Sequence, residues 1–442
     1  MKALYNTILM IPLILLTFLA CSRVNDSTID TPQSEDSQRI VPTVDGTDNP
    51  IIPFGETPST KSFVNGGNAF AFKLLKEIAE KEDGTFMISP LGVSLAFGML
   101  IEAAKEGEEL KEVRKLLGFE NGSREEIRKY CSTMIEMLPK MDKLSNLSIA
   151  NMALVNSDMG PVNSNYSNTA SGHYDALVKN MSFSSPKLVA GFVNDWVKEK
   201  TYGMIQKAMD EGDITPKSTA ILTNTLYFDG KWTSLFKESD TEKEEFYLED
   251  GRTKEIDMMK QETKFSFRWF YNDKSPVGGV LRMPYGNGSF AMDVYLLHDE
   301  NDSVGDLLKT MAENKSQQEE WQAIKTDLWF PRFELGEKRI ELNKVLADMG
   351  LERALSSDDW LSFFKNENQK SGIDKVYQTT AMKVNESGTE ASAVTIVTME
   401  GSAFGYNAQE QKLTFHCDHP FIYTITETST GAILFAGVFR GE

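Results

Sequence analysis

The stretch Lys383-Val-Asn-Glu-Ser-Gly-Thr-Glu-Ala-Ser-Ala-Val-Thr-Ile-Val-Thr398 decides which fold this sequence predicts. Its glycine, Gly388, is followed by small residues and then by β-branched ones. At a strand period of two, one face carries only compact, uncharged side chains: Thr389, Ala391, Ala393, Thr395 and Val397. Such a strand can enter a sheet above a tight core without burying a charge. Ser, Gly, Asn and Ala are frequent at 401–411, as in an exposed loop, so the pattern indicates a loop that can become a strand.

Seven other motifs accompany this stretch along the chain. Three of them are Phe86-Met-Ile-Ser-Pro90, Phe330-Pro-Arg-Phe333 and Asp418-His-Pro-Phe421. A fourth is Leu222-Thr-Asn-Thr-Leu-Tyr-Phe-Asp-Gly-Lys-Trp232, and the others lie at 193–197, 346–351 and 434–438. Together with residues 386–393, and in this order, they resemble the serpins, a family of protease inhibitors. One motif would be a weak signal, whereas eight in order between residues 63 and 440 are specific.

The resemblance implies an α+β protein with the serpin fold. In that fold, helices pack on a large central mixed β-sheet, two smaller sheets complete the core, and a reactive-centre loop is exposed. Hydrophobic spacing separately predicts helices at 68–80, 91–104 and 123–138. Apolar and alternating runs predict strands at 220–228, 291–297, 413–415, 421–426 and 433–439. The order of these elements agrees with the family.

The same resemblance implies an inhibitor rather than an enzyme. In serpins a serine protease cleaves the exposed loop, forms a covalent acyl complex and is trapped when the loop inserts into the central sheet, an established example of strand addition. The hinge that begins insertion corresponds to Glu386, Gly388, Thr389, Glu390, Ala391, Ser392 and Ala393. A proline or an inward-facing charge in the hinge would stall insertion. Neither is present, so an active, irreversible, single-use inhibitor is expected.

The reactive bond follows from a count along the loop. About seventeen residues from the hinge glutamate, as in the family, lead to the bond between Ser402 and Ala403. Small residues there suit an elastase-like serine protease, and also subtilisin-like enzymes or papain-like cysteine proteases. The alternative bait residues are Met399, Gly401 and Phe404, because the loop is a few residues longer than usual.

Two further groups are implied to control insertion. Arg332 matches the cation that pairs with the hinge glutamate, here Glu386, at the top of the sheet. The shutter, a polar network where the strands must part, corresponds to Ser89, Gly92, Asn224 and Gln378. This chain departs from the family there, since Gly92 replaces a common serine and Gln378 a common histidine. A shutter without histidine is expected to lack the pH sensitivity that this residue would give.

The N-terminal residues predict export and lipid anchoring. A basic start and a short apolar run end at Cys21, which resembles a bacterial lipoprotein cleavage box, and an ordinary secretory peptide is the alternative. The expected boundaries are a signal peptide at 1–20, a Ser/Thr/Asp/Pro-rich flexible tether at 21–62 and the serpin domain at 63–442. The protein should then be held by lipid at the bacterial outer membrane, facing the periplasm or the cell surface.

Composition narrows the choice of partners. A net charge of -19 argues against nucleic acid, whose phosphates need clusters of Lys and Arg. Some serpins bind sulfated glycans through a basic stripe on the helix that the resemblance places at 123–138. Here that helix mixes both charge signs, so no heparin-like activator is expected. The four histidines show no metal-ligand spacing, and neither a metal nor a cofactor is expected. Cys131 and Cys417 are predicted to be small buried hydrophobic residues rather than a disulfide, and the protein is expected to be a monomer.

Two other functions stay open at this stage. A non-inhibitory serpin that serves as a binding or carrier lipoprotein would have the same fold. An unrelated surface lipoprotein that captures glycans or host proteins would require all eight motif matches to be accidents. A rise in thermal stability after loop cleavage would exclude the latter.

Overall fold

The computed structural model describes residues 49–52, 54, 57–215, 217–314, 320–366, 368–389 and 412–441. Every described residue belongs to one compact unit, Pro42–Glu442. Predictions for Cys21, for Glu390 to Ala393 and for the reactive bond therefore concern residues outside the described part. No helix in that part is long and apolar enough to cross a bilayer.

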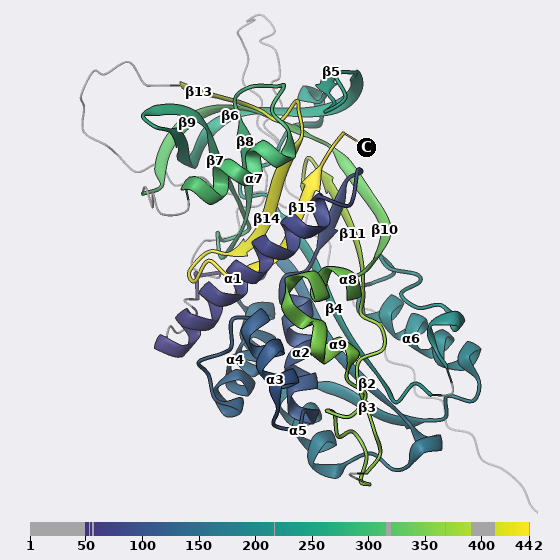
Figure 1. The fold of residues 1–442 in the computed structure, drawn as a ribbon. Coiled ribbons are helices and arrows are strands. Elements are labelled where there is room, and N and C mark those ends of the chain that lie inside the picture. The colour runs from purple at the N-terminus through teal and green to yellow at the C-terminus, as the bar shows by residue number, and fades with distance from the viewer. Residues whose placement is uncertain are drawn as a thin grey trace, which may run out of the picture. The chain divides into compact units, whose positions relative to one another are not determined.

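The central sheet has six strands in the order β10-β11-β12-β4-β2-β3. Figure 1 labels β10, β11, β4, β2 and β3 of this sheet. It is mixed, because β2 and β3 run parallel whereas the other neighbours are antiparallel. The bounds are β10 Phe333–Glu341, β11 Tyr377–Asn385, β12 Gly388–Thr389, β4 Ala220–Lys231, β2 Ser145–Asn156 and β3 Ala176–Met181. The predicted strand at 220–228 is confirmed as part of β4.

A second sheet has nine strands, in the order β1-β15-β14-β8-β7-β6-β9-β13 with β5 on β6. The two smaller sheets that were expected are thus continuous, because β6 is 20 residues long and pairs with β5, β7 and β9 along its length. The bounds are β1 Phe86–Ile88, β15 Ile433–Phe439, β14 Phe421–Glu427, β8 Phe290–Leu297, β7 Ser275–Tyr285, β6 Thr253–Asn272, β9 Gln322–Pro331, β13 Lys412–His416 and β5 Glu242–Tyr247.

Helices α2, α4 and α1 confirm the three predicted from hydrophobic spacing. Ser89 caps the buried helix α2 through its hydroxyl, and Pro90 supplies a preset first turn. Ser123 and Glu126 form a capping box that starts α4. The bounds are α1 Pro58–Ala79, α2 Pro90–Ala103, α3 Glu108–Leu116, α4 Arg124–Met137, α5 Ser164–Tyr174, α6 Pro186–Lys200, α7 Val304–Asn314, α8 Asn343–Leu346 and α9 Glu352–Ser356.

The flexible tether predicted to end at residue 62 differs from the structure at its C-terminal end. Helix α1 begins at Pro58, with Thr57 as its N-cap. Phe54, further upstream, is only 2% exposed. The polar composition of the whole segment hid these packing residues, because the prediction averaged over about forty positions.

Both cysteines that the structure describes are free and buried, as predicted. Burial raises the pKa of the Cys131 thiol to about 12. A thiol that stays protonated at neutral pH is a poor nucleophile. Cys131 therefore packs in the core between α2, α4 and α5 and is not a reactive thiol.

Candidate functional site

Two hinge residues already form a strand of the central sheet. Gly388 and Thr389 make up β12, which lies between β11 and β4. Thr389 pairs with Val384 on one side and with Gly230 on the other. A Cβ at position 388, where φ is 150°, would lie 2.1 Å from the Gly230 carbonyl oxygen. Only glycine therefore lets the chain enter between the two strands at this point.

The side chain of Thr389 is buried against Tyr285 of β7, a strand of the second sheet. It is 2% exposed, and its Oγ1 lies 2.7 Å from the hydroxyl of Tyr285. The Tyr285 ring stacks on Trp232 at 4.4 Å, and the Trp232 indole N–H donates to the Asn385 carbonyl oxygen at 2.9 Å. Burial raises the pKa of Tyr285, so its hydroxyl keeps its proton at neutral pH. These contacts fix the first inserted residue.

The structure brings Arg332 and Glu386 together, at 3.3 Å between Nη1 and Oε1. Glu386 is 7% exposed and also accepts a hydrogen bond from the Thr241 hydroxyl at 2.7 Å. Arg332 uses its other nitrogen, Nη2, on Asp257 at 2.9 Å. The hydrogen bond with Asp257 and the charge of Glu386 raise the pKa of Arg332. Lys243 lies 3.0 Å from Asp257, so the hinge carboxylate is part of a larger charged network.

Below β12 the central sheet is open. Among the described residues, β4 and β11 share no ladder pairs, and a cavity of about 820 Å³ lies between them. Its walls include Ala220 to Leu226 of β4 and Tyr377 to Thr380 of β11, and neither stretch carries an Asp, Glu, Lys or Arg. Val193 and Val197 of α6 and Val93 of α2 also line it. The facing stretches of β4 and β11 therefore present no charged side chain to a strand that would enter between them.

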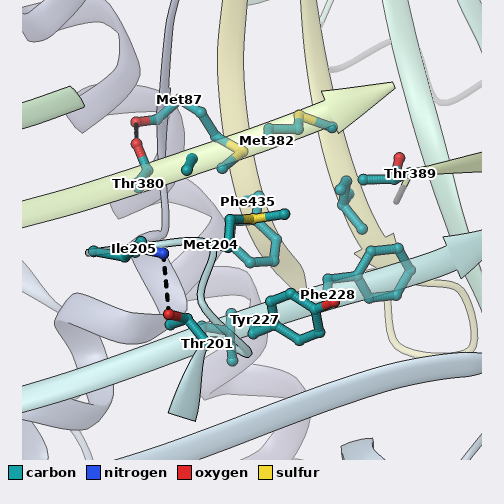
Figure 2. A pocket seen from close by; sticks show the side chains of 13 residues that line it. Met87, Thr201, Met204, Ile205, Tyr227, Phe228, Thr380, Met382, Thr389 and Phe435 are labelled. Carbon is teal, nitrogen blue, oxygen red and sulfur yellow. Dashed lines mark hydrogen bonds between the residues drawn. The ribbon is translucent and has the colours of Figure 1, made fainter. Parts of the chain in front are cut away.

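A smaller pocket marks the point where that strand would continue from Thr389. Figure 2 shows Phe228 of β4 and Met382 of β11 on either side of the pocket, with Phe435 of β15 behind them. Thr201 and Met204, which follow α6, line another side. The lining is dominated by apolar side chains, which favours small hydrophobic residues in this slot.

The four shutter residues lie at the floor of the cavity. Gln378 donates to the Ser89 carbonyl at 2.8 Å and accepts from the Ser89 N–H at 2.9 Å, so β11 is tied to the start of α2. Asn224 of β4 instead donates to Asn151 of β2 at 2.9 Å. A Cβ at Gly92 would lie 2.7 Å from Asn224 Oδ1. Glycine at position 92 therefore leaves room for the side chain of Asn224.

Sequence reasoning missed three residues of the hinge site. Trp232 appeared only as the end of a motif, and Tyr285 was not singled out. Thr241 carried no signal at all. Tyr285 and Thr389 are 104 residues apart in the chain, so only the fold brings them into contact.

Comparison with known proteins agrees with this geometry. The family model described as serpin (serine protease inhibitor) matches residues 65–440, and the chain belongs to the serpin family. Iripin-2 of Ixodes ricinus is 28% identical over 375 residues, which are 84% of this chain and 91% of that protein.

Solved structures show the same fold. Serpin48 of the insect Tenebrio molitor superposes with a TM-score of 0.74 at 24% identity, over 88% of this chain and all of that one. Human thyroxine-binding globulin, whose name states a binding function, superposes at 0.72 with 22% identity, over 86% and 98% of the two chains. Serpins in general inhibit serine proteases and are not enzymes.

Proposed function

We propose that this protein is an irreversible, single-use inhibitor of serine proteases that works by inserting its cleaved loop into the central sheet. The observation that carries the proposal is the position of β12 at the end of an open gap between β4 and β11, whose facing stretches 220–226 and 377–380 carry no charged side chain. The first inward-facing hinge residue, Thr389, is already buried there. The remaining inward-facing residues of the loop are alanine, threonine and valine, which can follow it.

The register of β12 gives the path of insertion. If its pairing continues, Ala391 meets Phe228 and Met382 in the small pocket. Four residues further along the loop, Thr395 lies between Asn224 and Gln378, at the level of the shutter. Each added residue exchanges an unpaired strand edge for ladder hydrogen bonds, worth about 0.5–1.5 kcal/mol apiece.

The chemistry belongs to the attacking protease. Its serine hydroxyl adds to the carbonyl carbon of Ser402, the bond to the Ala403 nitrogen breaks, and the new amine takes a proton and leaves. An ester then joins the protease to Ser402. Insertion of residues 390–402 carries the bound protease along the sheet before water can hydrolyse that ester. The outcome is a race between insertion and hydrolysis.

Small bait residues favour an elastase-like target. Ser402 and its neighbour Gly401 fit a shallow specificity pocket, and the nearest lysine after them is Lys412. Subtilisin-like and papain-like proteases accept such residues too. A trypsin-like enzyme, which needs Lys or Arg at the bait position, should not react.

The N-terminal residues support a lipid-anchored inhibitor outside the cytoplasm. Acylation of Cys21 would hold the chain at the outer membrane, and residues 22–48 would give it reach. The inhibitor would contact the membrane through this lipid alone.

On α4, Arg124 and Arg128 form ion pairs with Glu106 and Glu102, which leaves little unpaired positive charge for a heparin-like activator.

The test is to mix the purified full chain with neutrophil elastase and to run a denaturing gel with mass spectrometry. We expect an SDS-stable complex and a C-terminal fragment that begins at Ala403. The variant Thr389→Arg places a charge at a position that is 2% exposed, and should be cleaved without forming the complex. Clean cleavage of the wild-type chain without a complex would overturn the inhibitor proposal in favour of a binding or carrier serpin.

A further inference from the structure

A short segment ahead of α1 packs on the folded body although its composition predicts a free tether. The side-chain amide of Asn49 donates to Asp142 Oδ1 at 2.7 Å, and its oxygen accepts from the Lys143 N–H at 3.1 Å. Phe54 is 2% exposed, and its N–H donates to Ser429 Oγ at 3.3 Å. We call Asn49, Pro50 and Phe54 the N-terminal clasp.

The clasp touches loops that belong to both sheets. Asp142 precedes β2 of the central sheet, is 3% exposed and accepts from the Ser145 hydroxyl at 2.6 Å. On the other side, Asn287 in the turn between β7 and β8 donates to the Pro50 carbonyl at 3.3 Å. Ser429 follows β14 of the nine-stranded sheet. The clasp therefore bridges the start of β2 to two turns of the second sheet.

The residues that the clasp contacts are linked to β4, the strand that pairs with β12. Ser145 pairs with Gly230 of β4, and Gly230 pairs with Thr389 of β12. The turn residue Gly286 donates its N–H to the Lys231 carbonyl at 2.8 Å, and Lys231 is the partner of Gly388.

The turn at Gly286 packs so tightly against Asp142 that neither can move without the other. A Cβ at Gly286 would lie only 1.9 Å from Asp142 Oδ2, and the φ of this glycine is +46°. Displacement of the β4 end would therefore disturb Asp142 and, with it, the hydrogen bond from Asn49.

We propose that the N-terminal clasp keeps the insertion gap from filling before a protease arrives. In this proposal, insertion of an uncleaved loop beyond Thr389 shifts the ends of β2 and β4 relative to the turns of the second sheet, which the clasp joins to the start of β2. A contact changes an equilibrium or a rate only if it differs between the two states. The clasp spans the two parts that shift, so it stabilises the native state selectively. This inference rests on the proposed function.

The test compares four single variants of the full chain. Asn49→Ala removes the hydrogen bonds to Asp142 and Lys143, and Phe54→Ala removes the buried ring. Ile51→Ala and Ile52→Ala change neighbours that are 57% and 37% exposed. Each protein is incubated at 37 °C without protease, and its remaining ability to form a complex with elastase is followed. We expect the clasp variants to lose this ability about tenfold faster than the wild type, and the two controls to stay within about twofold. Equal half-lives in all five proteins would overturn the proposal.

Hydrogen exchange at the amides of 144–146 and 228–231 separates this inference from the proposed function. Faster exchange there in the clasp variants alone would support the clasp even if the wild-type chain forms no complex with any protease. Unchanged exchange would overturn it whatever the inhibitory activity. If Phe54→Ala does not fold, Asn49→Asp decides, because it keeps the oxygen that faces Lys143 and replaces the hydrogen bond to Asp142 with repulsion between two carboxylates.

Discussion

The contact between Thr389 and Tyr285 shows how much of the hinge depends on a single hydroxyl group. The two oxygens lie 2.7 Å apart in a buried site, and the aromatic stack of Tyr285 on Trp232 prevents the phenol from turning elsewhere. A threonine at the first inserted position is therefore more than a small residue that fits. It is the hydrogen-bond partner of a group that would otherwise be buried alone.

We predict that Thr389→Val lowers the free energy of unfolding by about 1–3 kcal/mol, because the valine leaves the Tyr285 hydroxyl without a partner. Tyr285→Phe should cost a similar amount or less. The double variant should cost less than the sum of the two, since both remove the same hydrogen bond. Thermal unfolding of the four proteins measures this cycle, and strictly additive costs would contradict the contact.

Gly92 makes a second residue-scale prediction. Gly92→Ala should lower the unfolding temperature of the wild-type chain, although alanine favours a helix by about 0.5–1 kcal/mol, because the new Cβ displaces Asn224 from Asn151. In an Asn224→Ala background the same change should raise the unfolding temperature. A stabilising effect in both backgrounds would mean that Asn224 does not need the space beside Gly92.

At the scale of elements, β13 is the strand that follows the proposed reactive loop in the chain. It pairs in parallel with β9, and Lys412 at its start lies 2.5 Å from Glu262 of β6. Lys325 of β9 approaches the same carboxylate at 2.7 Å. His416 at the other end stacks on Trp329 at 4.0 Å. One carboxylate thus links three neighbouring strands.

The anchoring of β13 should weaken in acid for a reason that can be assigned to Glu262. Lys325 and Lys412 lower the pKa of this carboxyl from its ordinary value of 4.5 to about 2. A lowered pKa contributes stability that is complete above about pH 4.5 and is lost as the pH falls toward 2. Glu262→Gln should therefore loosen β13 at pH 7 and make little difference near pH 2.

The fluorescence of Trp329, which contacts His416, can report this change during denaturant titrations of both proteins. A difference between wild type and Glu262→Gln that stays constant from pH 7 to pH 2 would contradict the assignment. Lys325→Gln is a useful control, because it removes one lysine and leaves the contact of Lys412 with Asp327 at 3.1 Å intact.

The elements were easier to predict from the sequence than their joints. Helices α2 and α4 follow from apolar spacing and from serine caps that a reader of the sequence can see. The union of two sheets into one could not be seen, because it depends on β6 having three strand partners along its 20 residues. The start of α1 at Pro58 was missed because one buried phenylalanine does not change the average of a polar segment.

At the scale of the whole molecule, the proposed insertion into the open gap predicts that the native chain is less stable than its cleaved form. Ten or more loop residues that join the sheet would add roughly ten hydrogen bonds at about 1 kcal/mol each. We therefore expect cleavage within residues 399–404 to raise the unfolding temperature by at least about 10 °C. Differential scanning calorimetry before and after limited proteolysis measures this, and an unchanged or lower temperature would argue against insertion.

The family and the class of fold could be predicted because eight motifs occur in one order, and each is tied to a packing role. The hinge pair Arg332 and Glu386 was placed from the same resemblance. The contacts of Tyr285 and of the N-terminal clasp were not, because both join segments far apart in the chain through hydrogen bonds that leave no periodic pattern.

The presence of β12 in the sheet also has a kinetic consequence. Adding a strand to a sheet requires nucleation and then elongation. Aligning the first residue pair is the slow step, and later pairs form quickly. Gly388 and Thr389 are paired before any protease arrives, so the nucleus of the new strand already exists. Under the proposed mechanism, the chain needs only to elongate a strand whose register is set once the loop is cut. The time available to the protease for hydrolysis would then be limited by elongation rather than by a search for alignment.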